Sequence, residues 1–137
     1  MSRPHLADAL LQASIALPNG AATVVSPAID LQVLDGSSEF QAQTELRVAV
    51  PALTVTQLPN TQTMTYDVIE SANADLSSPV VVAAGVFVQT GSGGAGAVVG
   101  SFRYRPASNA SRYLGYRATN SGSGNCSSVS AVGNLVF

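Results

Sequence analysis

The sequence predicts an all-β protein, an antiparallel two-sheet jelly-roll sandwich of about eight strands with an N-terminal arm. Seventeen valines and nine threonines lie almost entirely after residue 22, and β-branched side chains suit a pleated surface. Short apolar or alternating runs are separated by turn residues at a spacing of roughly 8–15 residues. No helical pattern lies between the runs, and strands without crossover helices must be mostly antiparallel.

The 137-residue length fits one domain, and its 46% hydrophobic content excludes wholesale disorder. Only 10% of the residues are charged and the net charge is −2, which argues against a general polyanion binder. One cysteine and one histidine exclude an internal disulfide framework and a Cys/His zinc cluster. We therefore expect no cofactor and no metal, and we divide the chain into an arm over residues 1–20 and a jelly-roll domain over residues 21–137.

Residues 6–17 allow two interpretations, a short helix or an extended arm that becomes ordered on a neighbouring surface. A dozen residues form a marginal helix without tertiary support, so the arm is favoured. Pro18-Asn19-Gly20 breaks the chain after it. A cleaved signal peptide is disfavoured because Asp8 and Gln12 interrupt the apolar stretch, and no segment reaches the roughly 18 apolar residues that span a bilayer.

The predicted strands follow in order after this break. Two short runs within residues 23–34 are split at Ser26-Pro27, and the later strands are predicted at 45–50, 52–58, 63–68, 80–89, 98–105, 112–119 and 128–137. Alternation places the following side chains on the inward face: Leu46, Val48, Val50, Met64, Tyr66, Val68, Leu114, Tyr116 and Ala118. The continuously apolar run 80–89 predicts a strand buried on both faces. The Gly-rich segment 91–96 predicts a β-hairpin loop, since it lacks the Gly-Lys-Ser/Thr ending of a phosphate-binding loop.

Charge is segregated along the chain. Residues 1–80 carry a net −6, whereas residues 81–137 carry +4. The C-terminal arginines are Arg103, Arg105, Arg112 and Arg117. One interpretation makes them members of cross-strand pairs on solvated faces. The other aims their guanidiniums at carboxylates of a partner, where the planar fork gives bidentate contacts.

No catalytic constellation emerges, so the sequence predicts a protein that is not an enzyme. Cys126 and His5 lie at opposite ends of the chain, and no Gly-x-Ser-x-Gly motif is present. The carboxylates of Asp67, Glu70 and Asp75 are best interpreted as solvated surface acids. The four tyrosines lie within predicted strands, where packing is their ordinary role.

Residues 104–106 (Tyr-Arg-Pro) and 112–119 (Arg-Tyr-Leu-Gly-Tyr-Arg-Ala-Thr), followed by a Gly-rich turn and a closing Val/Leu strand, resemble the end of the jelly-roll cement (decoration) proteins of tailed-bacteriophage heads. The short apolar arm, residues 22–31 and residues 65–71 resemble earlier parts of that family. The resemblance implies a structural virion protein, made in the host cytoplasm, that sits on the outer capsid surface. It also implies a homotrimer that clamps neighbouring subunits of the major capsid protein, with no nucleic-acid or membrane partner.

On this hypothesis the arm is the apolar anchor, with Leu6, Leu10, Leu11, Ile15 and Leu17 as contact candidates. The polar capsid or subunit contacts would be Arg103, Arg105, Arg112 and Arg117. A second hypothesis is a carbohydrate- or receptor-binding β-sandwich of a head fibre or tail. It predicts glycan binding that depends on Tyr113 or Tyr116.

Overall fold

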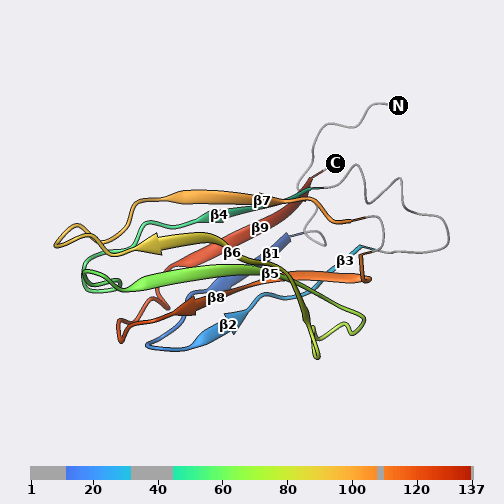
Figure 1. The fold of residues 1–137 in the computed structure, drawn as a ribbon, viewed down its shortest axis with the longest axis horizontal. Coiled ribbons are helices and arrows are strands. Elements are labelled where there is room, and N and C mark those ends of the chain that lie inside the picture. Colours follow the sequence, from blue (N-terminus) through green and yellow to red (C-terminus); the bar gives the residue numbers. More distant parts are fainter. Residues whose placement is uncertain (1–11, 32–44, 108–109, 137) are drawn as a thin grey trace.

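The structure is a computed structural model that describes residues 12–31, 45–107 and 110–136 (Figure 1). Within these ranges the secondary structure consists of nine strands and no helix. The strands are β1 (Gln12–Ala16), β2 (Thr23–Val25), β3 (Ile29–Asp30), β4 (Glu45–Val50), β5 (Thr63–Ser71), β6 (Val80–Thr90), β7 (Gly100–Tyr104), β8 (Tyr113–Asn120) and β9 (Ser130–Val136). Across the described ranges, no helix is long and apolar enough to cross a membrane.

The strands form two packed antiparallel sheets, which confirms the predicted fold class (Figure 1). One sheet has the order β1-β9-β4-β7 and the other has the order β2-β8-β5-β6. Both β2 and β3 pair with β8, so they act as one strand interrupted at Ser26 and Pro27. When β2 and β3 are counted as one strand, each sheet has four strands. This strand order is that of a jelly roll.

Most connections cross from one sheet to the other. Only β5 and β6 follow each other as neighbours in one sheet. The segment 91–96, predicted as a hairpin loop, instead leads from β6 in one sheet to β7 in the other. The prediction was wrong because turn composition marks a reversal but does not show which strand pairs with which.

The core lies between the two sheets and follows the predicted alternation. All nine side chains predicted to face inward are buried: Leu46, Val48, Val50, Met64, Tyr66, Val68, Leu114, Tyr116 and Ala118. An aromatic cluster fills the centre, where the ring centroid of Phe102 lies 5.6 Å from that of Tyr66 and 6.3 Å from that of Tyr116. Such tilted and edge-on contacts add to the stabilisation gained from burial.

Two buried tyrosines also connect separate parts of the sandwich. The hydroxyl of Tyr116, on β8, lies 2.6 Å from the carbonyl oxygen of Ala13 on β1 and 3.0 Å from that of Ala131 on β9. The hydroxyl of Tyr66 lies 2.9 Å from Oε1 of Gln89, which is itself buried. Burial raises the pKa of both phenols because the charged form would be poorly solvated.

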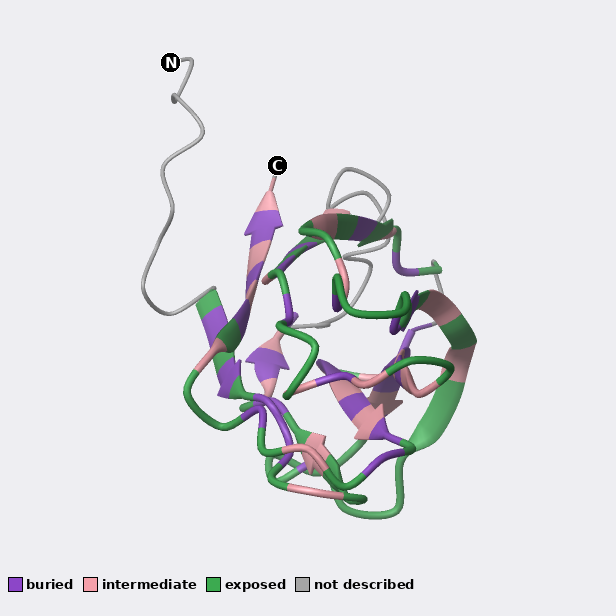
Figure 2. Ribbon diagram, turned by 90° about the vertical axis from the view of Figure 1, so that its left-hand side faces the viewer, coloured by how far each residue is buried: buried purple, intermediate pink, exposed green. Residues whose placement is uncertain are grey.

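The N-terminal segment differs from the prediction. The extended alternative is correct for Gln12–Ala16, but this strand pairs with β9 over five residues and belongs to the sandwich. Ile15 and Leu17 are only 6% and 1% exposed, so the predicted domain boundary at residue 20 is too late. Figure 2 shows the alternation of buried and exposed residues along this strand.

Two other predicted strands also differ. Residues 52–58 form turns, with Leu53 and Leu58 buried and a single bridge from Leu53 to Ala97. The apolar run that was expected to be buried on both faces is β6, which pairs only with β5 and forms the edge of its sheet. Val80 and Val88 on it are 58% and 46% exposed. A run of valines therefore did not distinguish a central strand from an apolar edge.

Candidate binding surfaces

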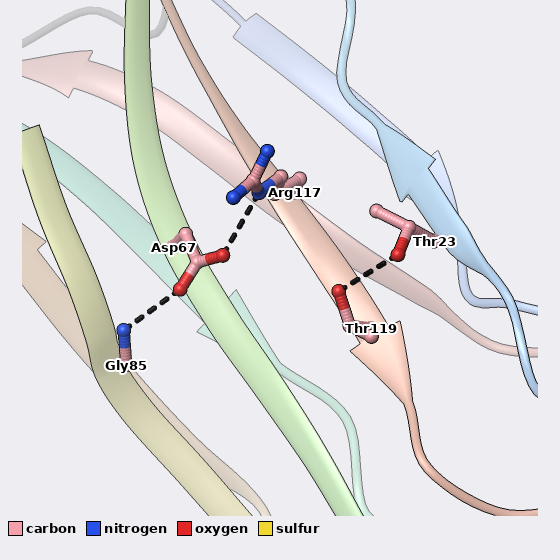
Figure 3. A network of polar contacts seen from close by, with 5 residues as sticks. All are labelled: Thr23, Asp67, Gly85, Arg117 and Thr119. Atoms are coloured by element: carbon pink, nitrogen blue, oxygen red, sulfur yellow. Dashed lines mark hydrogen bonds and ion pairs between the residues drawn. The ribbon is translucent and has the colours of Figure 1, made fainter. Parts of the chain in front are cut away.

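The outer face of the β2-β8-β5-β6 sheet carries a row of paired polar groups (Figure 3). Asp67 on β5 and Arg117 on β8 are direct cross-strand partners, and Arg117 Nε donates to Asp67 Oδ2 at 2.8 Å. The other carboxylate oxygen accepts the backbone N–H of Gly85 on β6 at 2.7 Å. Gly85 has a φ of +57° and sits where the β5–β6 register shifts. Asp67 therefore fixes a β-bulge.

This geometry corrects the interpretation of Asp67 as a solvated surface acid. Asp67 is only 9% exposed, and each of its carboxylate oxygens accepts a hydrogen bond. The guanidinium of Arg117 is held by the same carboxylate and its side chain is 30% exposed. For Arg117 the structure favours the cross-strand-pair interpretation over that of a partner contact.

Arg112 is neutralised in a similar way at the start of β8. Its Nε and Nη2 each donate to one carboxylate oxygen of Asp30, both at 2.9 Å. This bidentate pair raises the pKa of the Arg112 guanidinium, chiefly through the hydrogen bond to Asp30. The guanidinium carbon also lies 5.2 Å from the ring centroid of Tyr113. Arg112 therefore already has its carboxylate within the chain.

The arginines of the opposite sheet are arranged differently. Arg47 on β4 and Arg103 on β7 are direct cross-strand partners, so two like charges face each other on the outer side of this sheet. Glu45 contacts both, with Oε2 3.5 Å from Arg47 Nη2 and Oε1 3.3 Å from Arg103 Nε. Arg105 follows β7 directly, is exposed, and makes no ion pair with any described residue. Among the described residues, this outer face therefore carries more positive than negative charge.

A hollow of about 470 Å³ opens between these two arginines. Its lining comes from three neighbouring strands and comprises Arg47, Val48, Ala49, Ser101, Phe102, Arg103 and Asn134. Ala49 and Ser101 are cross-strand partners with short side chains, which leaves the space beside the guanidiniums open. Arg47 was not predicted as a contact residue, because the segregation of charge along the chain points to the C-terminal arginines. The alternation within residues 45–50 places Arg47 on the outward face, and this pattern could have identified it as a surface residue.

Exposed valines, together called the valine surface below, occur at both ends of β6 and in the segment that enters β7. Among the described residues, all seven exposed large hydrophobic side chains are valines, and five of them lie here: Val80, Val81, Val88, Val98 and Val99. The last two are 82% and 69% exposed. The carbonyl oxygen of Val98 accepts a hydrogen bond from Gln89 Nε2 at 3.1 Å, so a buried side chain holds this exposed segment.

The remaining candidates are placed as follows. Ile15 and Leu17 are buried in the core, so their prediction as apolar contacts to a partner is wrong. Leu6, Leu10 and Leu11 lie outside the described residues, as does His5. Tyr116 is fully buried and offers no platform to a sugar, which leaves the glycan hypothesis with the half-buried Tyr113.

The described ranges offer no metal-binding cluster of side chains. No group of three or more His, Cys, Asp or Glu side chains within those ranges could hold a metal ion. Cys126 is buried, and burial raises the pKa of its thiol. Asp75 lies in the β5–β6 loop, where a hydrogen bond from Ser77 lowers the pKa of its carboxyl.

Comparisons with known proteins add no family to this picture. No protein-family model matches the chain, and no curated protein matches it at a significant level of similarity. Fold and surface geometry are therefore the features on which a functional argument can rest.

Proposed function

We propose that this protein is a non-enzymatic structural protein of a virion, a cement or decoration protein of a tailed-bacteriophage head. In this role it binds the outer capsid surface, as a homotrimer, and clamps neighbouring major capsid subunits. The observation that carries the proposal is the exposed valine surface at β6 and at Val98–Val99. Val98 and Val99 are adjacent in the chain and are the two most exposed of the described large hydrophobic side chains, which favours a protein that acts by covering them with a partner. The jelly-roll fold and the sequence resemblance support the same role.

The physical mechanism is mass action. A clamp that binds the assembled shell and not its separated subunits adds its binding free energy to the stability of the shell. A threefold ring of heterologous contacts closes on itself and leaves no open end. Many equivalent clamps then act together against the internal pressure of a packaged genome, and none of them needs a reactive group.

Co-sedimentation with shells of the phage's major capsid protein tests the proposal. The wild-type chain is expected to pellet with shells at a saturating ratio and to raise their disassembly temperature. Val98→Gln with Val99→Gln should weaken this binding about tenfold or more, since interface cores are apolar and few residues dominate binding.

Val25→Gln is the matched control. Val25 is 47% exposed but lies on β2, at the edge of the β2-β8-β5-β6 sheet opposite to β6. It should bind like the wild type. Normal sedimentation of the double variant would show that the valine surface is not the contact. A wild-type chain that ignores intact shells would end the cement proposal itself.

A further inference from the structure

Arg47 and Arg103 form a cationic pair that the fold leaves only partly neutralised. They are direct cross-strand partners on an outer sheet face, a position where like charges repel. Glu45 is the single described carboxylate in contact with them. Counted over the described residues, two guanidiniums and one carboxylate leave one unit of positive charge at this place.

The contacts with Glu45 are also long. They measure 3.3 and 3.5 Å, whereas Arg112 and Arg117 reach their carboxylates at 2.8–2.9 Å. Charge-assisted bonds between guanidinium and carboxylate ordinarily fall at about 2.7–2.9 Å. Glu45 therefore lies between the two arginines without forming a short bond with either, and no other described residue accepts a hydrogen bond from their guanidiniums.

The two guanidiniums are accessible from the same hollow. The side chains of Arg103 and Arg47 are 68% and 54% exposed, and both line the hollow together with Asn134. The side chain of Glu45 is only 18% exposed, so the negative group lies deeper than the positive ones. An incoming anion would therefore meet the arginines before it met the carboxylate.

We propose that this hollow is a carboxylate-binding site, in which Arg47 and Arg103 together hold an Asp or Glu side chain of an acidic protein segment. Arg105, one residue beyond β7, extends the positive strip for a second acidic residue. A carboxylate fits because Glu45 shows that one carboxylate reaches both guanidiniums from below. A nucleic acid fits poorly, since strong binding needs several phosphate contacts and the whole chain is negatively charged. The site is independent of the valine surface and of the capsid proposal.

Titration of the wild-type protein with a tetraglutamate peptide tests this site, with the arginine Nε–Hε resonances as the readout. The resonances of Arg47 and Arg103 should shift, and a tetraglutamine peptide should leave them unchanged. Arg47→Gln and Arg103→Gln should each weaken binding about fivefold or more, because each removes one of two charged forks. Binding should also weaken as salt is raised.

Two further variants separate this site from general charge attraction. Arg112→Gln removes an arginine that Asp30 already neutralises, so binding should stay within about twofold of the wild type. Glu45→Gln removes the competing carboxylate and should strengthen peptide binding about threefold or more. Equal losses in Arg112→Gln and Arg103→Gln, or unchanged or weaker binding in Glu45→Gln, would overturn the proposal. Tighter binding of a single-stranded oligothymidine than of tetraglutamate would assign the hollow to phosphates instead.

Discussion

The N-terminal strand β1 should be indispensable to the fold, although the sequence presents it as part of a separable arm. Deleting residues 1–17 removes Ile15 and Leu17, which are 6% and 1% exposed, and the five residues that pair with β9. Truncating one such side chain to alanine costs about 2–5 kcal/mol, so the two together account for roughly 4–10 kcal/mol. A typical domain is stable by only about 5–15 kcal/mol. The deletion should therefore unfold the protein, whereas deletion of residues 1–11 retains all of β1 and should leave it folded.

Urea denaturation of a single variant measures the same effect without a deletion. Leu17→Ala should lower the free energy of unfolding by about 3 kcal/mol. With a slope of roughly 2 kcal/mol per molar urea, the midpoint should fall by about 1.5 M. Ser14→Ala is the control, because Ser14 is an exposed residue of β1 three positions before Leu17 and should change stability by less than about 0.5 kcal/mol. A Leu17→Ala midpoint equal to that of the control, or a well-folded product of the 1–17 deletion, would refute the placement of β1.

Three further predictions follow from buried polar groups. Asp67→Ala should cost about 2–3 kcal/mol and accelerate hydrogen exchange at the Gly85 amide, since that N–H loses its acceptor at the bulge; unchanged exchange would contradict this. Tyr66 and Tyr116 have pKa values raised above 10 in the folded state, so stability is complete below pH 10 and falls as the pH rises above it. Their tyrosinate absorbance should appear together with loss of the circular dichroism of the sheets, and non-cooperative titration of all four tyrosines near pH 10 would refute their burial. Cys126 should react with a thiol reagent at least about 100-fold more slowly in the native protein than in urea, and comparable rates would show that the thiol is accessible.

The sequence was sufficient to predict those strands in which alternation had a single meaning. In β4 and β8 apolar residues alternate with charged or small ones, and Leu46 and Tyr116 are buried as expected. The apolar run of β6 was ambiguous, because a strand buried on both faces and an edge strand awaiting a partner have the same composition. The difference lies in the order of the strands in the sheet, which depends on contacts far apart along the chain.

The candidate surfaces were harder to predict than the core. The segregation of charge along the chain drew attention to the C-terminal arginines, with no acid near them in sequence. In the fold, Asp67 and Asp30 come from the acidic half and neutralise Arg117 and Arg112. Arg47 lies in the acidic half and was overlooked. Strand register therefore decides which arginine lies opposite a carboxylate and which lies opposite another arginine.

Register also makes the two outer faces of the sandwich different. On one face the direct cross-strand partners are Asp67 and Arg117, and opposite charges in that position contribute roughly 0.2–1 kcal/mol. On the other face the equivalent partners are Arg47 and Arg103, which repel each other. Glu45 relieves part of that repulsion through two long contacts, and a second carboxylate would relieve more of it, so an acidic partner gains its own contacts and also the relief of an unfavourable pair. The β1-β9-β4-β7 face is thus the side of the sandwich on which an acidic surface should bind.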